Sequence, residues 1–121
     1  MRRGSIITKE TPRISDDNLY LLLRDENIEE FNALHQAGEK CNLSGLDFRG
    51  LDLRGLETDG INFSNAYFRQ TNLAGLNLTR CNLEGASIGG ANISGTYFPK
   101  ELSPREIMMS LRTGTRMRYG T

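Results

Sequence analysis

The chain has 121 residues, which is the size of one domain, and its 15 basic residues balance its 15 acidic residues. This neutral total gives no sign of a general nucleic-acid binder, although residues 14–40 carry seven acids against two bases and both ends of the chain are basic. No apolar run approaches the ~20 residues of a membrane span, and two cysteines give no disulfide framework. We therefore expect a soluble cytoplasmic protein.

Two helical elements are predicted before the main part of the chain. Residues 1–14 are expected to form an N-terminal arm, because Pro12 disfavours a continuous helix there. Residues 15–40 favour two short amphipathic helices, with Ser15 as a candidate N-cap and Gly38 as the stop of the second helix. We expect this helical cap to cover one end of the segment that follows.

Residues 41–100 repeat with a period of five. Every fifth residue from position 43 is Leu, Ile or Phe, with Thr58 as the single exception among twelve. The predicted core residues of this column are Leu43, Phe48, Leu53, Phe63, Phe68, Leu73, Leu78, Leu83, Ile88, Ile93 and Phe98. A second column, two residues earlier, is apolar or small, and a glycine closes most units.

A period of five fits neither a helix nor an open strand. It fits a chain that turns a corner after every unit, so that four units close a coil of twenty residues and both columns point inward. The sixty residues then form three coils whose backbones pair with one another at ~4.8 Å. In this arrangement Cys41 and Cys81 lie two coils apart, too far for a disulfide, and we expect both to be buried thiols.

The units resemble the pentapeptide-repeat family, whose pattern is roughly Ala-Asn/Asp-Leu-x-x. The likeness is clearest at 41–45, 81–85 and 91–95, which read CNLSG, CNLEG and ANISG. The resemblance implies an all-β solenoid, a right-handed quadrilateral β-helix, with twelve units here. The chain departs from the family in its first column, where Leu46, Leu51 and other large residues replace Ala.

Residues 101–121 are predicted to form a second cap and a basic tail. Ser103 and Glu106 form a capping box at the start of a short helix, and Gly114 ends it. We expect the helix to seal the last coil, so that the whole chain is one structural domain. For the tail, which begins at Thr115, we favour a solvated segment over docking on the acidic segment or on a partner.

A set of outward arginines and tyrosines is the candidate partner-binding surface, because these residue types are enriched at protein interfaces. The set comprises Arg49, Arg54, Tyr67, Arg69, Tyr97, Arg116 and Arg118. The alternative is an ordinary solvated face, since Asp47, Asp52 and other acids lie nearby.

The sequence favours a non-enzymatic interaction module or scaffold of bacterial type. The expected partner is another protein, with no membrane, nucleic acid, metal or cofactor, and the chain is expected to be a monomer or a weak homodimer. Some pentapeptide-repeat proteins mimic duplex DNA and inhibit gyrase, which is the alternative, but three neutral coils are short and uncharged for that role. An enzyme is the least favoured class: His35 has no catalytic constellation, and a filled interior is expected to leave no pocket.

Overall fold

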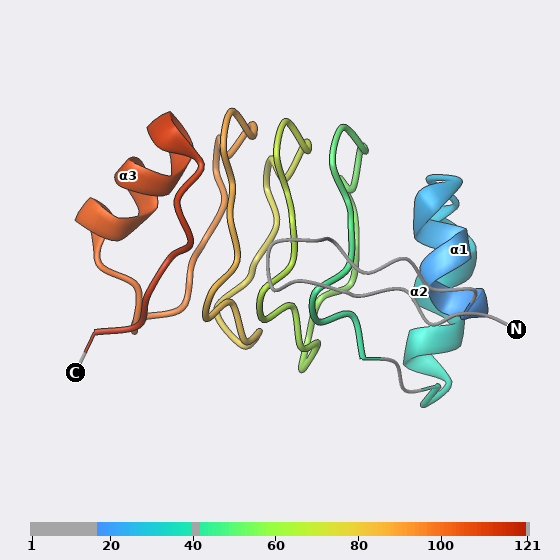
Figure 1. Cartoon of the computed structure of the whole chain (residues 1–121). Coiled ribbons are helices and arrows are strands. Elements are labelled where there is room, and N and C mark those ends of the chain that lie inside the picture. Colours follow the sequence, from blue (N-terminus) through green and yellow to red (C-terminus); the bar gives the residue numbers. More distant parts are fainter. Residues whose placement is uncertain (1–16, 40–41, 121) are drawn as a thin grey trace, which may run out of the picture.

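The computed structural model describes residues 17–39 and 42–120 (Figure 1). Helices α1 (Asn18–Arg24) and α2 (Ile28–Gln36) lie at one end of the molecule, and α3 (Pro104–Thr113) lies at the other. Between them the chain winds in stacked loops. The predicted arm, the candidate N-cap Ser15 and Cys41 lie outside the described residues.

The stacked loops are joined by parallel bridges between residues twenty apart in the sequence. Asp47 bridges to Tyr67, and Tyr67 bridges to Ser87, as one example. We call residues 42–60, 61–80 and 81–100 the first, second and third coil. The described residues contain only isolated bridges and no continuous strand, which differs from the predicted all-β sheet structure. A turn after every five residues leaves one bridging position on each side, and this is too short for a strand.

The apolar columns fill the interior of the coils. Nine of the eleven predicted core residues, from Leu43 to Ile88, are at most 1% exposed. Three phenylalanines form the widest part of this core: the ring centroid of Phe68 lies 5.3 Å from those of Phe48 and Phe63. Aromatic rings at this separation attract one another in addition to the area that they bury.

The corners of the coils require a left-handed backbone. Eight glycines at the ends of units, from Gly45 to Gly95, have φ between 67° and 84°. Asn65 and Gln70 occupy equivalent corners with φ of 59° and 58°. Where the position before a corner is Asn or Asp, it supports the turn, because its side-chain oxygen accepts from the amide two residues later, as Asn62 Oδ1 does from Ser64 at 2.9 Å.

The N-terminal helices cover the free edge of the first coil. Asp17 caps α1 and Asn27 caps α2 through their side chains. The hydroxyl of Tyr20, which is fully buried, donates to the carbonyl of Asp47 at 2.8 Å. The side chain of Asn32 donates to the carbonyl of Gly55 at 2.9 Å, and its oxygen accepts from the amide of Glu57 at 2.8 Å. These contacts satisfy backbone groups that the first coil would otherwise expose.

The C-terminal segment packs against the third coil, so the predicted solvated tail is wrong. Met117 is 0% exposed. The carbonyl of Met117 accepts from the amide of Gly85 at 2.7 Å, and the amide of Met117 donates to the carbonyl of Ala86 at 2.8 Å. The tail therefore provides the backbone pairing that a further coil would provide, and burial of Met117 adds a hydrophobic contribution.

The seal over the third coil is incomplete, in contrast to the prediction. Two amides of the third coil donate to α3. That of Ile88 donates to the hydroxyl of Ser110, and that of Gly90 donates to the carbonyl of Leu111. The following amides on this edge, at Ile93, Gly95 and Phe98, donate to none of the described residues. The predicted core residues Ile93 and Phe98 are for this reason only half-buried.

Candidate functional site

Four of the seven predicted surface residues meet on one side of the coils. We call this surface the basic face; it comprises Asp47, Arg49, Tyr67, Arg69 and Arg116. The first four residues stand on neighbouring coils because positions twenty apart are bridged there. Arg116 reaches the same side from the C-terminal segment, which sequence reasoning placed in solvent.

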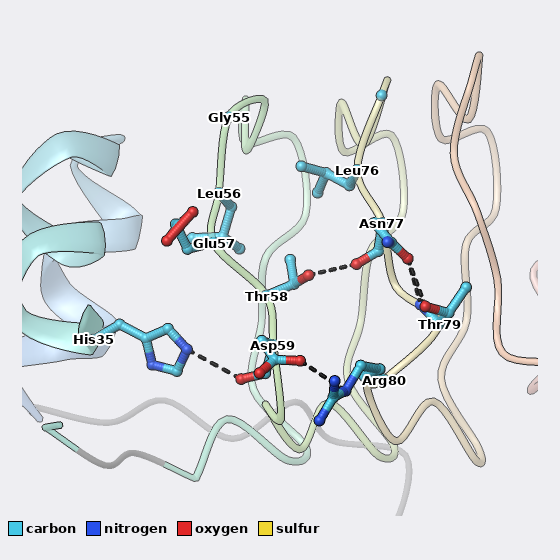
Figure 2. A pocket seen from close by; sticks show the side chains of 11 residues that line it. His35, Gly55, Leu56, Glu57, Thr58, Asp59, Leu76, Asn77, Thr79 and Arg80 are labelled. Carbon is cyan, nitrogen blue, oxygen red and sulfur yellow. Dashed lines mark hydrogen bonds and ion pairs between the residues drawn. The ribbon is translucent and has the colours of Figure 1, made fainter.

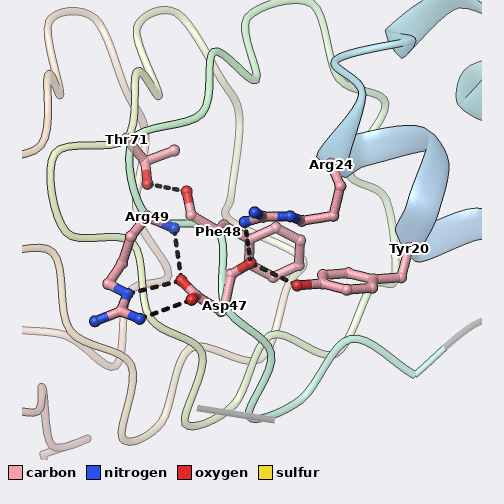
Figure 3. A network of polar contacts seen from close by, with 6 residues as sticks. All are labelled: Tyr20, Arg24, Asp47, Phe48, Arg49 and Thr71. Carbon is pink, nitrogen blue, oxygen red and sulfur yellow. Dashed lines mark hydrogen bonds and ion pairs between the residues drawn. The ribbon is translucent and has the colours of Figure 1, made fainter. Parts of the chain in front are cut away.

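Asp47 fixes the position of Arg49 (Figure 3). Its carboxylate accepts from Nε and Nη2 of Arg49, both at 2.8 Å, and also from the Arg49 amide at 2.9 Å. The two side chains lie on the same outward side because they are two residues apart in extended chain. The hydrogen bonds from Arg49 hold the pKa of Asp47 below its usual value. The Asp47 side chain is 12% exposed, whereas that of Arg49 is 51% exposed and remains open to a partner.

Tyr67 holds Arg116 in a similar way. The guanidinium carbon of Arg116 lies 5.1 Å from the centroid of the Tyr67 ring, and Nη2 donates to the Tyr67 hydroxyl at 2.6 Å. Another nitrogen, Nη1, donates to the carbonyl of Gly85 at 3.0 Å. A cation above an aromatic ring contributes about 0.5–1 kcal/mol at an exposed site. Tyr67 is therefore an anchor for the C-terminal segment as well as a surface residue.

Arg69 lies beside the C-terminus of α3. A Cβ atom on Gly114, which caps this helix, would lie 2.4 Å from Nη2 of Arg69, and one on Gly89 would lie 3.3 Å from its Cζ. Glycine at both positions leaves room for the guanidinium. The negative end of the helix dipole favours a cation there.

The basic face has a net positive charge. Its three arginines outnumber its single aspartate, which gives 3 − 1 = +2. Arginine binds carboxylates and phosphates through a planar pair of N–H groups. Two of the three guanidinium groups are held by neighbours, so they lose less side-chain entropy when a partner binds.

The remaining predicted residues lie elsewhere. Arg54 pairs with Asp52 at 2.7 Å on the next side of the coils. Arg118 approaches Glu84 at 3.4 Å. Tyr97 is 65% exposed on the side that carries Thr58 and Asn77. These three residues do not extend the basic face.

Groups that could support catalysis are separate from one another. Nε2 of His35 donates to the carbonyl of Asp59 at 3.1 Å, and its ring stacks on Phe31. Cys81 is a free thiol whose pKa is raised to about 11 by burial. In residues 17–39 and 42–120, no three His, Cys, Asp or Glu side chains are grouped to hold a metal. None of the described helices is long and apolar enough to cross a membrane.

The prediction that a filled interior leaves no pocket did not consider the outer surface of the coils. The interior is filled, but an open cleft of about 390 Å³ lies between α2 and the side of the first two coils that carries Thr58 (Figure 2). The cleft depends on where α2 lies against the coils, and sequence periodicity alone does not give that position.

Comparison with known families supports the resemblance seen in the sequence. Residues 61–98 match the pentapeptide repeat family, in 8 copies. No curated protein and no solved structure gave a significant match to the chain. The matched pentapeptide repeats cover the second and most of the third coil. The unmatched first coil is the part whose inward column carries Leu46, Leu51 and Leu56 where the family favours Ala.

The sequence indicated part of this site. An Asp-x-Arg pattern occurs twice, at Asp47–Arg49 and Asp52–Arg54, and extended geometry places both members of each pair outward. The contact between Tyr67 and Arg116 was not predicted, because it joins residues 49 positions apart. The only signal for it was the apolar Met117 within a basic tail.

Proposed function

We propose that this protein is a non-enzymatic interaction module that binds an acidic surface of another protein through the basic face. The gathering of Arg49, Arg69 and Arg116 around Tyr67 carries the proposal. Pentapeptide repeats are typical of interaction and scaffold proteins, and the match at 61–98 supports this class. Complementary charge favours fast and specific association with an acidic partner.

The proposal includes the architecture that presents this face. We propose one domain built as a right-handed quadrilateral β-helix of three coils, acting in the bacterial cytoplasm as a monomer or weak homodimer. The repeat register of twenty residues supports the quadrilateral form. Stacked coils hold Arg49 and Arg69 at a fixed spacing, so the surface is preformed before binding.

DNA mimicry is not supported by the charge of this surface. A mimic of duplex DNA needs dense negative charge, whereas the basic face is net positive. A gyrase supercoiling assay that shows inhibition at low protein concentration would reverse this ranking.

An affinity capture with charge-reversed variants tests the proposal. Arg69→Glu should weaken capture of the bound protein roughly tenfold, about 1.4 kcal/mol, because it reverses one of the three positive charges of the face. Arg105→Glu makes the same charge change on α3, away from the face, and should leave capture unchanged. Thermal unfolding of both variants checks that the fold is retained.

Equal capture by the wild type and the two variants would reject the basic face as the binding surface. Loss of capture with both variants would show that net charge, rather than this surface, decides binding.

A further inference from the structure

The helices that close the two ends of the stack are not polar on their outer faces. Stacks of repeats stay separate and soluble because their terminal caps present a polar outer surface. Among the described residues, the exposed large apolar side chains are Leu21, Met108 and Met109, each 43% exposed, and Tyr97, 65% exposed. Three of these four belong to the cap helices α1 and α3 rather than to the coils.

The outer side of α3 combines methionines with arginines. Ser110 is buried, and Ile107 and Leu111 pack against the core, so the opposite side of the helix faces outward. We call this outward side the Met face; it comprises Arg105, Met108, Met109 and Arg112. A shallow hollow of about 290 Å³ lies along these side chains. The Met face is thus an apolar patch with a positive charge at each end.

The outer side of the N-terminal cap also has an apolar residue at its surface. Leu19, Tyr20 and Leu23 of α1 are buried, and Leu21 points away from them and from the first coil. We call the surface around it the acidic end; it comprises Leu21, Asp25, Glu29 and Glu30, all of which are exposed. Glu29 and Glu30 belong to the first turn of α2, which contacts α1.

The two ends of the molecule have opposite charge. Residues 17–39 carry six acids and one arginine, which gives 1 − 6 = −5. That arginine, Arg24, is directed to the carbonyl of Asp47 in the first coil at 3.4 Å. Residues 101–120 carry four arginines and two glutamates, which gives 4 − 2 = +2. The Met face and the acidic end are therefore complementary both in charge and in having an apolar centre.

We propose that the Met face of one copy binds the acidic end of a second copy, so that the chain associates head to tail. Leu21 of the second copy packs on Met108 and Met109, and the arginines on either side face its carboxylates. The two surfaces lie at opposite ends of the molecule, so one copy cannot join them within itself (Figure 1). Because the contact joins two different surfaces, each added copy leaves one of each free and an open chain of copies forms.

The contact is weak, because a single helix face buries less than the ~800 Å² per partner of a standard interface. We expect a Kd of about 0.1–1 mM. None of its residues belongs to the basic face, so the association does not depend on the function proposed above. At micromolar concentrations the copies are separate, and Arg105→Glu therefore remains a valid control for affinity capture.

Sedimentation equilibrium of the full chain tests the association. At low salt and up to ~2 mM protein, the weight-average mass should rise from the 13.6 kDa of one copy to beyond that of two copies. Raising the salt to ~0.5 M should weaken the association roughly fivefold, because the charges on both surfaces are screened. A mass that stays at one copy would overturn the proposal. A mass that levels off at two copies would also overturn it, because it would indicate a closed dimer.

Two variants that each block one end identify the surfaces. Met109→Glu places a negative charge on the Met face, and Leu21→Arg places a positive charge on the acidic end, so each variant alone should remain a monomer. An equimolar mixture should associate again, because the unchanged acidic end of the first variant meets the unchanged Met face of the second. Tyr97→Glu is the matched control: it replaces the exposed apolar residue on the coils and should associate as the wild type does.

Thermal unfolding of the three variants checks that each retains the fold. A mixture of the two folded end variants that stays monomeric would contradict the head-to-tail contact. So would association of Met109→Glu or Leu21→Arg alone at the wild-type level, or an equal loss of association in Tyr97→Glu.

Discussion

Asp47 connects three parts of the molecule through one residue. Its side chain holds Arg49 on the basic face, and its backbone carbonyl accepts from Tyr20 and Arg24 of α1. Its position on the ladder joins it to Tyr67. A carboxylate that accepts three N–H groups while mostly buried is worth more to stability than the exposed pair of Asp52 and Arg54.

Asp47→Asn should therefore lower the free energy of unfolding. It should also make that free energy depend less on pH in the acidic range. Because the pKa of Asp47 is lower in the folded chain, the stabilisation is present above the unfolded pKa and is lost as the pH falls through the folded value. At pH 6 the variant should lose about 1–2 kcal/mol of unfolding free energy, and the loss should shrink towards pH 2. Urea unfolding across this range measures it.

The matched control is Asp52→Asn, which removes a similar but more exposed partner of Arg54. Its effect should stay below about 1 kcal/mol. Equal losses from the two substitutions at every pH would show that burial does not strengthen the Asp47 pair.

At the scale of the elements, the corners limit what sequence the coils accept. Gly50 and Gly85 both have positive φ, at 76° and 80°. A Cβ atom on Gly50 would meet nothing within 4 Å, whereas one on Gly85 would lie 2.1 Å from Oδ1 of Asn65. Backbone strain is common to both corners, but steric conflict arises at only one of them.

Gly85→Ala should for this reason destabilise the protein more than Gly50→Ala. The strain of a left-handed alanine is about 1–2 kcal/mol in each variant. In Gly85→Ala the side chain of Asn65 must also move, and the nearby pairing of Gly85 with Met117 is disturbed. Thermal unfolding of the two variants compares them directly, and equal melting temperatures would contradict the packing at this corner.

Elements with local signals were predictable from the sequence. The N-cap at Ser103 and the stop at Gly114 are in place, with Ser103 Oγ accepting from the Glu106 amide at 3.1 Å. The other half of the predicted capping box is not, because the Glu106 carboxylate accepts from the Arg118 amide at 2.8 Å. The inward column was also predictable, because an apolar residue at every fifth position is itself the sign that these side chains are buried. The docking of Met117 and the cleft beside Thr58 were not, since both depend on residues far apart in the chain.

At the scale of the whole molecule, the ends decide whether the stack is closed. Side chains of α1 and α2 pair with the first coil, and the C-terminal segment pairs with two sides of the third. The same C-terminal segment supplies Arg116 to the basic face. Closure of the stack and assembly of the proposed binding surface thus depend on the same contacts of the C-terminal segment.

The central claim is that the chain returns to the same side every twenty residues. Through-space NMR contacts between the ring protons of Phe48 and Phe68 test it most directly, because their centroids lie 5.3 Å apart although they are twenty residues apart in sequence. Strong contacts between these rings, and between Phe48 and Phe63 at 5.7 Å, are the predicted result. Phenylalanine rings that contact only their sequence neighbours would contradict the coil, and with it the proposed basic face.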